Sequence, residues 1–231
     1  MGLGTGPACT GPIALELQYA FLRDWYFITN ESPAALLTPE HFPRLDPAGD
    51  TLMRVVNSGP TAEVEVMTDV FCAAMNAAHK RILVVTPYFV PPPDLLRALR
   101  LAALRGVKVQ LVVPAKNNHI YAGLAGKALY EQLLLTGVEV YERRPPFLHA
   151  KAMIVDDQVS IVGTANLDNR SLRLNYESNL VVFDESFARA LKRVVREDMA
   201  QSEALDLKAW QARPAYRKVA ENLCSLLTPL L

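Results

Sequence analysis

Six polar residues between positions 149 and 177 have side chains of the kinds that handle phosphate groups. They are His149, Lys151, Asp156, Thr164, Asn166 and Glu177. A lysine ammonium and an asparagine amide can hold the non-bridging oxygens of a phosphodiester as negative charge grows in a transition state. A histidine, whose ordinary pKa is about 6.5, can attack phosphorus when neutral or protonate a leaving alkoxide when charged. These residue types therefore indicate phosphodiester chemistry.

Two predicted strands must bring these side chains together. The first covers Leu148–Val155 and the second covers Val159–Gly163, with a polar turn between them. Side chains alternate between the two faces of a strand, so His149 and Lys151 point the same way. The pair is therefore expected on one face of a hairpin.

The length of the turn decides which residues the second strand adds to this face. An even-length loop sets His149 opposite Asn166 and Lys151 opposite Thr164, so that four polar groups share one face. A three-residue loop would turn the partner strand over. The turn Asp156-Asp157-Gln158 has no Asn-Gly pair to decide between the two. We build the expected site on the even-length loop.

Two carboxylates complete the candidate site. Glu177 opens the predicted strand Glu177–Phe183 and is the nearest carboxylate in sequence that could hold the second ring nitrogen of His149. Asp156 lies at a strand end, where it could brace the turn or pair with a nearby cation. A hairpin with polar residues on one face is usually a solvated surface, but apolar runs flank this one. Since an unsatisfied buried polar group costs roughly 1–3 kcal/mol, a cluster of them favours a functional interpretation.

The spacing of these residues resembles a known signature. His149-Ala-Lys151, four residues, Asp156, six residues and Gly163-Thr164-Ala-Asn166 are similar to the HKD motif of the phospholipase D superfamily. The surrounding FLHAKAMIVDD and GTANLDNRSLRLNYESN resemble bacterial cardiolipin synthases. The resemblance implies an enzyme in which histidines from two such motifs work as a pair, one forming a phosphohistidine and the other acting as acid and base, without a metal or organic cofactor.

The resemblance also implies a role for each residue. Lys151 and Asn166 would bind phosphate, with Thr164 in support. Glu177 would orient His149, and Asp156 would brace the site. In the family the histidine of the first motif is the usual nucleophile, so His149 would correspond to the general acid.

The chain is similar to the second half only of such an enzyme. Residues 1–50 read as a remnant of the first half: a helix over Pro12–Ile28, similar to the one that closes that half, and a Pro-rich linker. Residues 51–231 read as one phospholipase D-like domain with a single motif. The first motif would lie upstream. The helix belongs to the absent half, so its apolar stripe would either be exposed or block the self-complementary contact of a homodimer, which makes a homodimer the weaker option. A histidine could come from that half or from a second copy of the chain.

The domain has the pattern of an α/β fold. Strands are predicted at 52–57, 81–86, 107–113 and 138–141 besides those named above, and helices at about 63–79, 94–105, 120–136 and 184–200, with one or two short helices after 206. Such alternation predicts a largely parallel sheet covered by helices on both faces. With the resemblance, this is the three-layer α/β/α sandwich of phospholipase D, with a mixed, largely parallel sheet.

Three further features surround the candidate site. Thr86-Pro-Tyr-Phe-Val-Pro91 resembles a loop near the family's active site, where Tyr88 and Phe89 would line a lipid or glycerol pocket or simply pack the loop. His119 follows a strand and could touch substrate. The tail, ending Leu-Leu-Thr-Pro-Leu-Leu, could dip into a membrane interface or complete the core. Four arginines flank the motif and could raise the local potential: Arg143, Arg144, Arg170 and Arg173.

Bulk properties limit the partners. Lys plus Arg and Asp plus Glu both count 24, and this zero net charge argues against a general nucleic-acid binder. Three scattered cysteines fit no metal spacing and suit a reducing compartment. No apolar run of about 20 residues and no signal peptide is apparent. We expect a peripheral protein on the cytoplasmic side of the cell membrane.

The leading hypothesis is a cardiolipin synthase-like phosphatidyltransferase. It would pass a phosphatidyl group between phosphatidylglycerol molecules through a phosphohistidine, with a second motif from a partner half or subunit. The alternatives are a phospholipase D-type phosphodiesterase, which differs in admitting water as acceptor, and an inactive half-enzyme that binds a complementary half or phospholipid.

Overall fold

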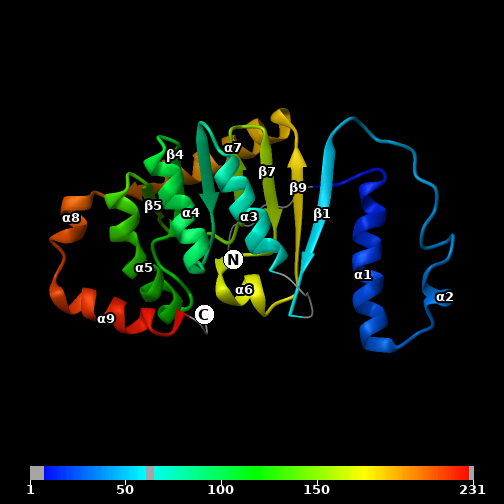
Figure 1. Cartoon of the computed structure of the whole chain (residues 1–231), viewed down its shortest axis with the longest axis horizontal. Coiled ribbons are helices and arrows are strands. Elements are labelled where there is room, and N and C mark those ends of the chain that lie inside the picture. Colours follow the sequence, from blue (N-terminus) through cyan, green and yellow to red (C-terminus); the bar gives the residue numbers. More distant parts are fainter. Residues whose placement is uncertain (1–7, 61–64, 229–231) are drawn as a thin grey trace.

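The computed structural model describes residues 8–60 and 65–228 (Figure 1). Its centre is an eight-stranded sheet in the order β1-β9-β7-β6-β2-β4-β5-β10. These strands are β1 (Leu52–Ser58), β2 (Arg81–Val85), β4 (Lys108–Pro114), β5 (Glu139–Arg143), β6 (Ala152–Val155), β7 (Val159–Gly163), β9 (Glu177–Phe183) and β10 (Ser202–Ala204). A separate two-stranded sheet pairs β3 (Phe89–Val90) with β8 (Leu167–Asp168).

The helices are close to those expected. They are α1 (Ile13–Thr29), α2 (Pro33–Leu36), α3 (Val66–Ala77), α4 (Pro93–Leu104), α5 (Ile120–Leu135), α6 (Asn169–Arg173), α7 (Glu185–Ala200), α8 (Leu207–Gln211) and α9 (Ala215–Ser225). The expected start of α3 at 63 and the last three residues of the tail lie outside the described residues. Within the described residues, no helix has both the length and the apolar character needed to cross a bilayer.

The sheet is mixed, as expected, but it is not largely parallel. Parallel pairing is confined to β2–β4 and β4–β5, whereas the other neighbours in the eight-stranded sheet run antiparallel. Parallel neighbours need a crossover of a dozen or more residues, and α4 and α5 provide two. Only three residues join β6 to β7, so these two strands must pair as an antiparallel hairpin.

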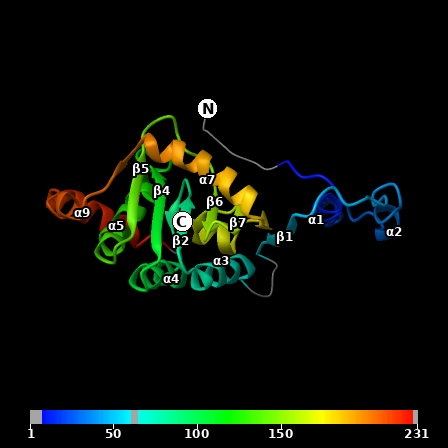
Figure 2. The same ribbon diagram turned by 90° about the horizontal axis from the view of Figure 1, so that it is seen from above.

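Helices cover both faces of the sheet, which confirms the expected three layers (Figure 2). On β2, Ile82 and Val84 face a core shared with α3 and α4, while Leu83 and Val85 face a core shared with α7. This is the alternation that a strand buried on both faces requires. The sheet is therefore a rigid base whose strand ends can carry a site.

Helix α1 lies apart from these layers, beyond the edge strand β1 (Figure 1). Its side chains Phe21, Trp25 and Ile28 are 58%, 41% and 78% exposed, and Leu22 is its one buried residue. The second half of the expected stripe is thus exposed, whereas Ile13, Leu17 and Ala20 in its first half are half-buried. An exposed stripe of this kind usually marks an interaction surface.

The β6–β7 hairpin corrects the expected register. Val155 pairs with Val159 and Ala152 with Val162, so three residues, not an even number, form the loop. Asp156 and Asp157 have positive φ angles of 53° and 60°, which aspartate tolerates better than most residues. Continuing this register would set Lys151 opposite Gly163 rather than Thr164. The expected cross-strand pairs are therefore wrong.

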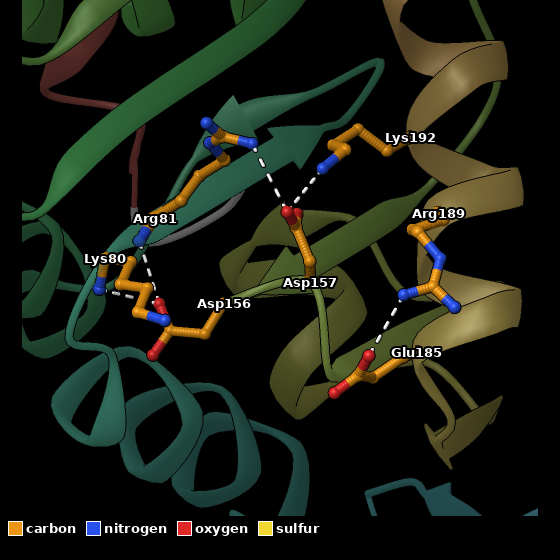
Figure 3. A network of polar contacts seen from close by, with 7 residues as sticks. All are labelled: Lys80, Arg81, Asp156, Asp157, Glu185, Arg189 and Lys192. Carbon is orange, nitrogen blue, oxygen red and sulfur yellow. Dashed lines mark hydrogen bonds and ion pairs between the residues drawn. The ribbon is translucent and has the colours of Figure 1, made fainter.

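Asp156 braces the fold instead of facing the site. Its carboxylate accepts three backbone N–H bonds, from His79 at 2.8 Å, Lys80 at 2.7 Å and Arg81 at 2.8 Å. Figure 3 shows the bonds from Lys80 and Arg81. Although burial raises the pKa of this carboxyl, the three bonds lower it by more, so the net shift is downward. Asp156 lies at the opposite end of β6 from His149, so its carboxylate acts here as a brace for the fold.

We expect Asp156→Asn to lower the free energy of unfolding by about 1 kcal/mol, because one charged acceptor of several backbone bonds is lost while the positive φ is still tolerated. The lowered pKa means that this stabilisation is present above the unfolded-state value near 4 and is lost as pH falls below it. Urea unfolding at pH 7 and at pH 3.5 measures both effects. Glu185→Gln is the matched control, since Glu185 pairs with exposed Arg189 (Figure 3) and its replacement should change stability by less than about 0.5 kcal/mol. Equal losses in the two variants would contradict the brace.

Candidate active site

The site lies where β2 and β4 end and where the chain enters β6. Here the segment after β7 is tied to the loop after β2. Thr86 makes the connection: its hydroxyl donates to the carbonyl of Tyr88 at 2.8 Å and accepts the amide of Leu167 at 3.3 Å. The β3–β8 pair extends it, with Phe89 opposite Leu167. Asn166 is thus brought to the site by this small second sheet, not by pairing with His149 across the hairpin.

His149 and Lys151 lie together, as predicted, although β6 begins only at Ala152 and not at Leu148. Lys151 Nζ is 3.3 Å from Nδ1 and 3.2 Å from Nε2 of the His149 ring, and it donates to the His149 carbonyl at 2.9 Å. His149 is exposed and Lys151 is half-buried. The histidine is therefore open to a substrate that the lysine could hold.

The environment shifts both pKa values downward. Burial lowers the pKa of Lys151 to about 8, although the charges of Glu177 and Asp168 act in the opposite direction. Burial and, secondly, the charge of Lys151 lower the pKa of His149 below its ordinary 6.5. At neutral pH the pair is thus an ammonium beside a largely neutral imidazole. This suits binding of an anion by Lys151 and proton acceptance by His149, and a lowered pKa also makes the protonated ring a stronger acid.

Glu177 is buried at the start of β9, close enough for its charge to act on Lys151. Its Oε1 accepts a hydrogen bond from Asn175 Nδ2 at 3.2 Å. The structure records no hydrogen bond between Glu177 and His149 among the described residues, so the expected contact is not formed here. The carboxylate instead contributes negative charge behind the lysine.

Thr164 ties the end of β7 to β9. Its hydroxyl accepts the amide of Ser178 at 3.0 Å and donates to the Ser178 carbonyl at 3.4 Å. A hydroxyl has one hydrogen to donate, so Thr164 has none free for a phosphate. The preceding Gly163 is required by the same close approach, because a Cβ there would lie 2.4 Å from Asn179 Oδ1. In this structure the Thr164 hydroxyl braces β7 against β9, and its phosphate contact stays a prediction.

The side chain of Asn166 is held by Ser171, a residue that was not among those predicted for the site. Its Nδ2 donates to Ser171 Oγ at 2.9 Å, and its buried Oδ1 has no partner in the described part of the chain. Asp168 caps α6 by accepting the Ser171 amide at 2.6 Å, and burial raises the pKa of its carboxyl. The Asp-x-x-Ser spacing at a helix start was the available signal for this cap.

A pocket of about 650 Å³ opens beside these residues. Asn166, Asp168 and Arg170 line one side, and Tyr88 and His119 line the other. The rings of Tyr88 and His119 are 5.4 Å apart, and Phe147 lies between Tyr88 and His149, at 6.3 Å from the first and 5.9 Å from the second. Tyr88 and His119 are thus pocket residues, whereas Phe89 is 3% exposed and belongs to the core.

Of the four flanking arginines, Arg170 alone lines this pocket. The other three form ion pairs elsewhere: Arg143 with Asp198, Arg144 with Glu203 and Arg173 with Glu65. Arg143 is itself buried at the end of β5. The positive charge expected around the site is therefore supplied by Arg170 and Lys151 and not by the other three arginines.

The contact between Lys151 and His149 can be tested directly. In Lys151→Met the pKa of His149 should rise, because one of the two causes that lower it is removed. An NMR titration of the His149 ring protons measures the change. Lys108→Met removes the same charge at the start of β4, at the other end of the sheet, and should leave the His149 pKa unchanged. A lower or unaltered pKa in Lys151→Met would contradict the arrangement.

Comparisons with known proteins show the family of this chain. Residues 71–199 match the family described as cardiolipin synthase, phospholipase D-like domain. The chain is 38% identical over 225 residues to cardiolipin synthase A of Pectobacterium carotovorum subsp. carotovorum (strain PC1), covering 96% of this chain and 46% of that protein. It is 35% identical over 221 residues to the major cardiolipin synthase ClsA of Bacillus subtilis (strain 168), with the same coverage. The chain thus spans about half the length of these relatives.

Solved structures share the fold at lower identity. Nuc of Salmonella typhimurium, a phospholipase D family member, superposes with a TM-score of 0.58 at 22% identity, covering 68% of this chain and 99% of that one. Phosphatidylserine synthase of Haemophilus influenzae Rd KW20 gives 0.61 at 16% identity, over 78% and 47% of the two chains. With the family match covering more than half of its length, this chain belongs to the phospholipase D-like domain family of cardiolipin synthases.

Proposed function

We propose that this chain is the second half of a cardiolipin synthase-type phosphatidyltransferase. The observation that carries the proposal is the half-buried ammonium of Lys151 against the exposed ring of His149, beside a pocket lined by Asn166. A cation next to a titratable base at a pocket edge is the arrangement that phosphodiester transfer needs. The names of the relatives supply the substrate class, a phospholipid.

The reaction has two steps, and His149 moves a proton in each. In the first, a histidine of the partner motif attacks the phosphorus of one phosphatidylglycerol, the bond to glycerol breaks, and protonated His149 gives its proton to the leaving glycerol oxygen. In the second, neutral His149 takes the proton from a hydroxyl of another phosphatidylglycerol, which attacks the phosphohistidine and frees the partner histidine. Two phosphatidylglycerols thus yield cardiolipin and glycerol. The lowered pKa of His149 favours the neutral form that the second step requires.

Lys151 and Asn166 hold the phosphate in this proposal. The ammonium of Lys151 neutralises charge on the non-bridging oxygens, and the amide of Asn166 is a donor once it turns from Ser171. An unpartnered buried oxygen, such as Asn166 Oδ1, costs about 1–3 kcal/mol and is typical of a position kept for function. Glu177 stabilises the ammonium of Lys151 through its buried negative charge. The positive charge comes from side chains, so the mechanism uses no metal or organic cofactor.

The nucleophile comes from outside this chain. The relatives are about twice as long as the chain, and α1 exposes Phe21, Trp25 and Ile28 beyond the edge of the sheet. An apolar helix face of this size fits contact with a further domain or with a second copy of the chain. We propose that this partner supplies the second motif and that the complex works peripherally on the cytoplasmic side of the membrane.

The test uses phosphatidylglycerol labelled in its headgroup glycerol and in its acyl chains. The chain, alone and together with a partner that carries the second motif, is mixed with vesicles. Labelled cardiolipin and free glycerol in a 1:1 ratio are expected. Phosphatidic acid without cardiolipin would favour the hydrolase, for which the exposure of His149 to water is the supporting observation. Lack of any product in the complex would favour the inactive half-enzyme.

A further inference from the structure

Helix α9 turns its apolar face outward. Tyr216, Val219, Leu223 and Leu226 recur at helical spacing, and their exposed fractions are 69%, 56%, 61% and 74%. A surface helix of a globular protein normally buries such a stripe and exposes its polar side. Here the arrangement is reversed, so the stripe is not part of the core.

Polar contacts fix the inner face of α9. Glu221 is 4% exposed and accepts two hydrogen bonds from Arg213, at 2.6 and 2.9 Å. The guanidinium of Arg213 stacks on the ring of Trp210, 3.2 Å from its centre, and Trp210 is itself buried in the core. A bidentate pair anchored on a buried ring sets the rotation of the helix about its axis. The outward direction of the stripe is therefore imposed by the fold.

The stripe lies at the edge of the molecule that carries the pocket. Helix α9 packs along α5 and runs toward α6 (Figure 1). Just beyond it, the carbonyl of Thr228 accepts a bond from Asn169 Nδ2 at 3.0 Å, next to the pocket residue Asp168. At the start of α5, Ile120 and Tyr121 are 70% and 64% exposed and line the same pocket. The end of the α9 segment and two exposed apolar residues of α5 thus both adjoin this pocket.

The charge of the segment favours one kind of occupant. Residues 207–228 contain four basic residues and one acidic residue, Glu221, which is taken by Arg213. Arg217 and Lys218 adjoin the stripe directly. Exposed apolar residues flanked by basic side chains are the pattern of a helix that lies in the interface of an anionic membrane.

We propose that α9 docks the protein onto a bilayer containing anionic phospholipid, with the stripe at the boundary between headgroups and acyl chains. This rests on the proposed function, because a phospholipid substrate must reach the pocket from a membrane. Docking through α9 places the pocket edge formed by Ile120 and Tyr121 at the lipid surface. The sequence left open whether this tail completes the core or contacts a membrane. In this proposal α9 does both: its inner face packs on the fold, and its outer face contacts lipid.

The test measures co-sedimentation of the full chain with vesicles, without turnover. Leu223→Ser/Leu226→Ser should lower the partition onto vesicles of phosphatidylglycerol and phosphatidylcholine by roughly 10-fold or more. Arg217→Gln should lower it roughly five-fold on these vesicles and leave binding to pure phosphatidylcholine unchanged. The matched control is Leu104→Ser/Leu135→Ser, which removes two leucines of 64% and 60% exposure at the ends of α4 and α5. Circular dichroism checks that each variant is folded.

Several outcomes overturn the inference: no vesicle binding by the unaltered chain, equal losses in the two leucine pairs, or loss only in Phe27→Ser/Ile28→Ser on α1. Vesicle binding that persists in Leu223→Ser/Leu226→Ser while association with the upstream half or a second copy is lost would make the stripe a protein contact instead. Failure of the proposed function is separate: it would appear as missing cardiolipin in a protein that still binds vesicles through α9.

Discussion

Replacing His149 with alanine should reduce phosphatidyl transfer by at least about 100-fold in the complex with the upstream half. The expectation follows from the proton that His149 must move in both steps, since a positioned acid–base group contributes roughly 10²–10⁴ to a rate. His149 is exposed, so its loss leaves the core intact. The measurement is the initial rate of cardiolipin formation from labelled phosphatidylglycerol, with vesicle binding as a check that the protein still reaches its substrate.

A second histidine provides the control. His79 follows α3 and lies near Asp156, at the other end of the hairpin. Its backbone amide, and not its ring, donates a hydrogen bond to the Asp156 carboxylate. His79→Ala should therefore keep the full transfer rate. Equal rates in His149→Ala and the unaltered chain would remove His149 from the mechanism and with it the proposed function. A partial product, with phosphohistidine accumulating, would place the defect in the second step.

The sequence predicted the elements of this fold well, because their signals are local. The alternation of short apolar strands with capped helices located the sheet and both helical layers, and the helix expected at 184–200 is α7. The register of the β6–β7 hairpin failed for a specific reason. Asp156 and Asp157 both adopt positive φ angles, which adds a residue to the loop, and nothing in the sequence distinguishes this from a tighter turn.

The sequence predicted which residues form the site better than it predicted how they are arranged. His149 and Lys151 are neighbours because they are two residues apart on an extended segment, and this could be inferred locally. Asn166 reaches the site only because Leu167 bonds to Thr86, 81 residues earlier, and such a pairing leaves no local pattern. The same reason explains why Asp168 was not predicted as a site residue. Its effect on Lys151 arises from proximity in space, whereas its sequence signal is that of an ordinary helix cap.

Replacing Lys151 with methionine should lower kcat/KM for transfer by roughly 10²–10³, the usual loss when one charged stabiliser of a transition state is removed. Methionine keeps the length and apolar stem of the side chain, so the packing around Ala152 and Ala165 should persist. Lys151 also predicts a pH dependence. Because burial lowers its pKa to about 8, the ammonium is present below pH 8 and is lost above it, so kcat/KM should fall as the pH rises through 8.

Lys151→Arg separates charge from position in this prediction. Arginine stays protonated throughout the range, so the fall above pH 8 should disappear even if the planar guanidinium lowers the overall rate. Lys108→Met, which removes an exposed lysine paired with Glu139, should retain both the rate and the pH profile of the unaltered chain. If kcat/KM still falls above pH 8 in Lys151→Arg, the titration belongs to another group. The ammonium of Lys151 would then have a structural role and no role in catalysis.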